Sequence, residues 1–304
     1  MNTLQPWPLL LATGLTLGLG APIARAAAAQ GVGPLAFALW PTLLAGLALA
    51  FLGLWRHGLR GDRLRLANFG LVAGLLGHAL PMTALFWLSS HAGAGFASLS
   101  LALPPVFTLA FSLVLGRERV AWLRVVAVGL GFCGALVMLS GRGGSYEATP
   151  LVIALALAIP ASIGAGNVYR AIWLPHGVAG EWLSAATLLA SSSLLAIVGV
   201  LCGGVSAPVE PAPLAWLALQ SAVLVLGYLL YFALQRRADP VTFSFIGYVM
   251  MLTGVAAGTL LLGEQLSWVV WPASCLVLLA LCLLARAARP SLQMAPRLRE
   301  RKPA

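Results

Sequence analysis

One histidine lies in the middle of a long apolar segment, and it is the first candidate for chemistry. His78 lies in the segment LLGHALP, where Pro81 frees backbone groups of the preceding turn. A polar side chain in such a segment needs a hydrogen-bond partner or a water-filled cavity, and imidazole changes charge near neutral pH. Two interpretations stay open. His78 either hydrogen-bonds a substrate in a cavity or bonds the backbone of a neighbouring helix in a structural role.

Other polar and aromatic side chains within apolar segments are candidates for the same site. A tyrosine offers an apolar ring and a hydroxyl tip, which suits zwitterionic or aromatic metabolites. Ser and Thr hydroxyls commonly bond across membrane helices, so packing is the alternative for each of these residues. Together with His78, the predicted substrate-binding residues are Trp87, Asn167, Tyr228, Tyr231, Tyr248, Ser98 and Ser244.

The carboxylates lie at the ends of the apolar segments. Glu118 and Glu264 occupy such ends, where a hinge or structural role near the membrane interface is favoured over proton coupling. An intramembrane enzyme would need paired acids, a His/Glu metal set or a nucleophile with its base at membrane depth, and the sequence contains none of these. We therefore predict no catalytic residue, no metal and no cofactor. The four cysteines have neither disulfide nor metal spacing, and we expect them to be small buried hydrophobic residues.

The composition requires a membrane environment for these residues. The chain has 304 residues, of which 61% are hydrophobic and 9% charged, whereas soluble proteins average about 25% charged residues. Uncharged runs of roughly 20 residues, enough to cross a bilayer as a helix, recur almost end to end. We predict an all-α integral membrane protein with ten transmembrane helices near residues 7–28, 34–55, 67–88, 93–115, 121–140, 150–172, 181–203, 213–235, 240–262 and 267–287.

Basic residues are divided unequally between alternate connections. Cytoplasmic loops carry the excess of Lys and Arg in membrane proteins. Of the 18 Lys and Arg residues, all but Arg25 and Arg142 fall on one side when the N-terminus is placed in the cytoplasm. This count assigns Arg170 to a connection, as it does Arg56 and Arg124. Both termini are therefore predicted to be cytoplasmic, and the net charge of +10 reflects topology rather than a nucleic-acid partner.

A stretch from His91 to Trp122 recurs in degenerate form from Arg237 to Trp268, at one constant offset that also aligns the other spans. Five spans per unit invert the second unit in the membrane, which is typical of secondary transporters. The predicted units are residues 1–145 and 146–289, followed by a disordered cytoplasmic tail, 290–304. The residues assigned to gating or helix packing are Gly18, Gly20, Gly164, Gly166, Pro104, Pro105, Glu118 and Glu264.

Two stretches carry a family resemblance. They are LSLALPPVFTLAFSLVLGRERVAWLRVVAVGLGFCGALVML in the first unit and FSFIGYVMMLTGVAAGTLLLGEQLSW in the second. With their Gly-x-Glu and Gly-Glu ends, they resemble the EamA-type transporters of the drug/metabolite transporter superfamily, and the resemblance covers nearly the whole chain. It implies two inverted five-helix repeats around a central cavity lined by the first, third, fourth, sixth, eighth and ninth helices. It also implies export or exchange of small metabolites such as amino acids.

The expected function is therefore secondary transport of a small organic metabolite, an amino acid or a related compound, across a bacterial inner membrane by alternating access. Export is the expected direction. The expected partners are the small-molecule substrate and the lipid bilayer, and both a monomer and a homodimer are compatible with the sequence. An intramembrane enzyme and a non-transporting membrane scaffold are the alternatives.

Overall fold

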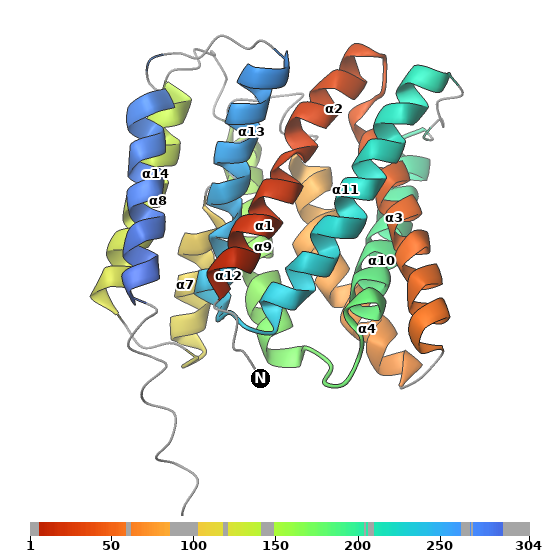
Figure 1. Ribbon diagram of the computed structural model, residues 1–304, viewed down its shortest axis with the longest axis horizontal. Coiled ribbons are helices and arrows are strands. Elements are labelled where there is room, and N and C mark those ends of the chain that lie inside the picture. The colour runs from red at the N-terminus through yellow and green to blue at the C-terminus, as the bar shows by residue number, and fades with distance from the viewer. Residues whose placement is uncertain are drawn as a thin grey trace, which may run out of the picture.

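The computed structural model describes residues 6–58, 62–85, 103–117, 121–140, 149–203, 205, 210–262, 268 and 270–287. Within these ranges every regular element is a helix (Figure 1). The helices are α1 (Pro6–Gly18), α2 (Gly20–Ala29), α3 (Pro34–His57), α4 (Arg63–Gly74) with the π-helix η1 (Leu75–Ala79), α7 (Pro104–Val114), α8 (Trp122–Ser140), α9 (Pro150–Trp173), α10 (Gly180–Leu201), α11 (Pro211–Gln235), α12 (Pro240–Ser244), α13 (Ile246–Leu262) and α14 (Val270–Ala287).

Proline and short acidic or hydroxyl side chains set many of the helix starts. Proline occupies the first turn of α3, α7, α9, α11 and α12, where its missing N–H would have had no helical partner. The side chains of Asp62, Thr149 and Asp239 accept a bond from the backbone N–H three residues later, at the starts of α4, α9 and α12. Pro104 and Pro105 are accordingly the first two residues of α7.

Seven described segments are long and apolar enough to cross a membrane: Pro6–Ala29, Pro34–His57, Arg63–Leu85, Pro150–Trp173, Gly180–Leu201, Pro211–Gln235 and Pro240–Leu261. Shorter apolar helices occupy Pro104–Val114, Trp122–Gly134 and Trp271–Leu284. The prediction of an all-α membrane protein is confirmed, and the ten-helix inverted repeat stays a prediction. The cysteine prediction was wrong, because all four cysteines are exposed on the bundle exterior, where lipid takes the place of a protein core.

The main helix contacts join the first half of the sequence to the second. Helix α8 packs along α14 at one edge of the bundle, and α3 packs along α10 at the other (Figure 1). Between them, α1 lies against α13 and α11, and α7 lies against α9. The interior of the protein is therefore largely an interface between the two halves of the chain, so a side chain buried there can touch both.

Candidate functional site

A π-helix holds His78 at the centre of the segment Arg63–Leu85. Pro81 lacks the N–H that would bond the Gly77 carbonyl in an α-helix, and its ring crowds that carbonyl. The wider turn accommodates this disruption, and π-turns are frequent at functional sites. Side chains from two other helices bond carbonyls in this region. Ser162 Oγ on α9 donates to Leu76 O at 2.8 Å, and Ser191 Oγ on α10 donates to Gly74 O at 3.2 Å.

Both ring nitrogens of His78 have side-chain partners. His78 Nε2 lies 3.2 Å from Thr42 Oγ1 on α3, and Nδ1 lies 3.4 Å from the Tyr228 hydroxyl on α11. Thr42 Oγ1 donates its hydrogen to Ala38 O at 2.6 Å, so it can only accept from the imidazole. The neutral imidazole therefore carries its proton on Nε2 and accepts from Tyr228 through Nδ1. Both neighbours belong to other helices, and the bonds are to side chains rather than backbone.

Arg170, in the last turn of α9, is buried with 1% of its surface exposed. Its Nη2 donates to Asn167 Oδ1 at 2.6 Å, and its Nη1 donates to Ala73 O at 3.4 Å, while its Nε has no hydrogen-bond partner. The assignment of Arg170 to a connection was therefore wrong. The predicted span 150–172 already contained this residue, and its spacing of three from Asn167, one helix turn, was the signal for a shared face.

Aromatic rings cover the Arg170 guanidinium. Its Cζ lies 5.2 Å from the ring centre of Tyr231 and 5.9 Å from that of Phe243, distances at which cation–π attraction operates. Tyr231 also stacks on Tyr228 with ring centres 5.3 Å apart, so the His78 and Arg170 groups are continuous. Asn167 Nδ2 in turn donates to Thr108 Oγ1 on α7 at 3.1 Å. We call this group the polar cluster, and its members are Thr42, His78, Thr108, Asn167, Arg170, Tyr228 and Tyr231.

The structure brings together His78, Asn167, Tyr228 and Tyr231 of the predicted site. Tyr248 lies elsewhere: its hydroxyl donates to Val128 O on α8 at 3.3 Å. Ser244 bonds the carbonyl of Val241, in its own helix, at 2.6 Å. Four further predicted site or hinge residues lie outside the described residues: Trp87, Ser98, Glu118 and Glu264.

The glycines assigned to gating or packing lie at helix contacts. A Cβ on Gly18 would lie 2.6 Å from Thr253 Cβ on α13, and one on Gly164 would lie 2.8 Å from Phe107 Cβ on α7. Gly20 faces the Gln220 amide, and Gly166 faces Gly77 beside Arg170. Each therefore permits close approach between helices. A role in gating stays a prediction.

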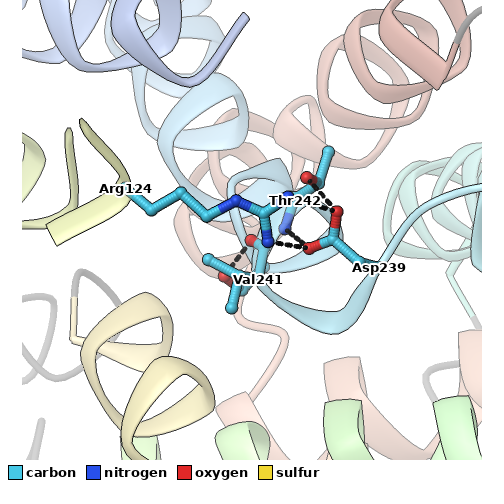
Figure 2. A network of polar contacts seen from close by, with 5 residues as sticks. Arg124, Asp239, Val241 and Thr242 are labelled. Atoms are coloured by element: carbon cyan, nitrogen blue, oxygen red, sulfur yellow. Dashed lines mark hydrogen bonds and ion pairs between the residues drawn. The ribbon is translucent and has the colours of Figure 1, made fainter. Parts of the chain in front are cut away.

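A second polar network joins α8 to the start of α12 (Figure 2). Arg124 Nη1 and Nη2 donate to the two carboxylate oxygens of Asp239 at 3.2 and 3.3 Å. The same carboxylate accepts from Thr242 N at 2.9 Å and Thr242 Oγ1 at 2.7 Å. One acidic side chain thus caps a helix of the second half and pairs with a cation from the first.

A cavity of about 920 Å³ lies where α3 ends, α4 begins and α9 connects to α10. Its ionisable lining residues are Arg56, His57, Asp62, Arg65 and His176. It is bounded by residues 175–179, which directly follow the end of α9 that carries Arg170. Cations therefore predominate in this cavity at that end of the bundle.

An apolar helical bundle with a buried polar cluster is the architecture of a polytopic membrane protein, and comparison with known proteins defines its family. Residues 7–140 match the EamA-like transporter family. The Uncharacterized inner membrane transporter YedA of Escherichia coli (strain K12) is 30% identical over 262 residues, covering 80% of this chain and 81% of the relative. The chain belongs to the EamA-like transporter family, as the sequence resemblance indicated.

Other relatives agree with this assignment. The Uncharacterized transporter YvbV of Bacillus subtilis (strain 168) is 26% identical over 273 residues, covering 88% of this chain and 87% of the relative. A protein of Streptantibioticus cattleyicolor named Probable terminal-alkyne amino-acid exporter is 29% identical over 153 residues, or 50% of each chain. A solved crystal structure with 21% identity has a similar fold, with a TM-score of 0.73 over 94% of this chain and 96% of that one.

Proposed function

We propose that this chain is a secondary transporter that moves a small organic metabolite, an amino acid or a related compound, across the bacterial inner membrane. The observation that carries the proposal is the polar cluster, which lies buried where helices of both sequence halves meet. Polar groups at this depth are costly and typically mark substrate pathways. The names of the relatives favour transport over the alternative of an intramembrane enzyme.

The proposed mechanism is alternating access by two inverted five-helix repeats, with both termini on the cytoplasmic side. Contacts between the halves support it, because α3, α4 and α8 pack mainly on helices of the other half. Rocking one repeat against the other would open the polar cluster to each membrane face in turn. The similarity to a protein named as an amino-acid exporter supports amino acids as substrates and export as the direction.

Counterflow in proteoliposomes tests this function. Purified protein is reconstituted into vesicles loaded with one unlabelled amino acid, and uptake of the same labelled amino acid is followed against protein-free vesicles. We expect saturable exchange for at least one member of a panel of the twenty amino acids. Absence of saturable exchange across the panel, with protein that is folded and inserted, would contradict the proposed function.

A further inference from the structure

We propose that Arg170 is the binding residue for the carboxylate of the transported metabolite, so that the substrates are small carboxylates rather than amines or cationic drugs. This inference rests on the proposed transport function and adds the chemical group that the site recognises. The supporting observations are the buried cation, its buried Nε–H without a hydrogen-bond partner and an arginine that lines the nearby cavity.

Arg170 is a buried cation without a protein anion among the described residues. Asp62 caps α4, Glu181 pairs with Arg56, Asp239 pairs with Arg124, and Glu210 is exposed before α11. A guanidinium stays protonated in proteins, and burial of an uncompensated charge is costly. The carbonyl end of α9 favours a cation, but these partial charges offset only part of a full charge. An anionic ligand would complete the compensation.

The unpaired N–H donor of Arg170 lies in the plane of its guanidinium. Tyr231 and Phe243 take ring contacts with the group, while Nε has no partner and Nη1 makes only a long bond of 3.4 Å to Ala73 O. A carboxylate binds a guanidinium in its plane through two parallel N–H···O bonds. The unpaired Nε and Nη2, the Nη atom on the same side of the guanidinium, provide this fork, while the second Nη2 hydrogen donates to Asn167 and Nη1 keeps its bond to Ala73.

The cavity at the end of α9 offers a cationic side chain to an incoming anion. Arg56, Arg65 and Asp62 line it, and Glu181 beside the cavity is paired with Arg56 and His57. The formal charges of the two arginines and the two carboxylates cancel, but Arg65 has no ion pair among the described residues and can attract an incoming anion at the mouth of the cavity. In the proposed topology this mouth faces the cytoplasm, the side from which an exporter takes its substrate.

Gly77 allows the guanidinium to occupy its position, because a Cβ at residue 77 would overlap Arg170 Nη1. Gly77→Ala therefore displaces the guanidinium while it keeps the charge. Gly129→Ala on α8 is the matched control, since a Cβ there meets nothing within 4 Å. This pair keeps the inference testable if Arg170→Gln does not fold.

The experiment compares three probes that share one side chain: L-leucine, L-leucinamide without the carboxylate, and 4-methylpentanoate without the amine. The same comparison is made with the phenylalanine series. Competition against the labelled amino acid that gives exchange in wild-type vesicles measures transport, and thermal shift of purified protein measures binding. We expect both carboxylate probes to compete and the amides to compete roughly 10- to 100-fold less well, the range of charge-assisted hydrogen bonds.

Arg170→Gln should abolish this preference for carboxylates, and Arg170→Lys, which keeps the charge without the fork, should reduce it. Gly77→Ala should also reduce it, whereas Gly129→Ala should leave it unchanged. Equal competition by amides and carboxylates in the wild type would overturn the inference and leave transport intact. An unchanged preference in folded Arg170→Gln would do the same. A wild type without any exchange would instead overturn the proposed function and this inference with it.

Discussion

Replacing Asp239 measures how strongly the two halves are joined at the α8–α12 contact. The side chain makes two kinds of contact: it caps α12 through Thr242 and pairs with both Nη atoms of Arg124. Asn at this position keeps a cap acceptor and removes the charge, whereas Ala removes both. Asp62 is the matched control, because its carboxylate accepts from Arg65 N at 3.0 Å and has no ion pair within the part of the chain that the structure describes.

The size of the effect follows from partial burial. The Arg124 side chain is 10% exposed and that of Asp239 is 33% exposed. Exposed pairs contribute about 0–1 kcal/mol, and loss of one partner of a buried pair costs about 3–5 kcal/mol. We therefore expect Asp239→Asn to lower the free energy of unfolding by about 2 kcal/mol. Asp239→Ala should lower it by about 3 kcal/mol, because loss of the cap adds about 1 kcal/mol.

Equilibrium unfolding in detergent micelles titrated with SDS, followed through the 10 tryptophans, provides the measurement. Asp62→Asn should be nearly neutral, and Asp62→Ala should cost about 1 kcal/mol. The difference between the two Asn variants isolates the ion pair. If Asp239→Asn and Asp62→Asn unfold alike, the pair between α8 and α12 contributes nothing to stability and the reasoning fails.

Three further substitutions test the site and its packing. His78→Ala should lower exchange in proteoliposomes while the elution profile and helix content stay those of the wild type, and unchanged kinetics would make this residue structural. Gly18→Ala should destabilise by about 1–3 kcal/mol through overpacking against α13, measured as a lower melting temperature, and Gly129→Ala, with open space around it, should not. Tyr248→Phe should cost about 0.5–1.5 kcal/mol for its bond to Val128 O and leave substrate preference unchanged; a changed preference would place Tyr248 at the site.

Local signals in the sequence were sufficient to predict that the chain is helical and to select His78 as a candidate site residue. Proline and Asp62 mark helix starts because their preferences are local, and a histidine in an apolar segment is conspicuous without a structure. Arg170 was missed because the charge count treated it as a loop residue. Its burial depends on Tyr231 and Phe243, which are distant in sequence, and no local pattern contains that contact.

The two tyrosine positions illustrate the same limit. Tyr228 and Tyr248 both lie in apolar helices, and neither hydrophobicity nor periodicity distinguishes them. Tyr228 meets His78, whereas Tyr248 fits against the bare backbone of Gly131 on α8. The π-helix is only partly visible in the sequence, because Pro81 indicates a disrupted turn but the bonds from side chains of α9 and α10 to this region come from distant residues. Tertiary contacts determine the environments of both tyrosines.

The π-helix also sets the rotation, about the helix axis, of the segment that follows it. A π-turn contains about one residue more than an α-turn, and one residue of an α-helix corresponds to about 100° of rotation and 1.5 Å of rise. If η1 returned to α geometry, the residues from Leu80 to Leu85 would therefore change the face that they present to their neighbours. The bonds from Ser162 to Leu76 O and from Arg170 to Ala73 O oppose that change. A ligand that took Arg170 away from Ala73 would remove one of these two restraints on helix register.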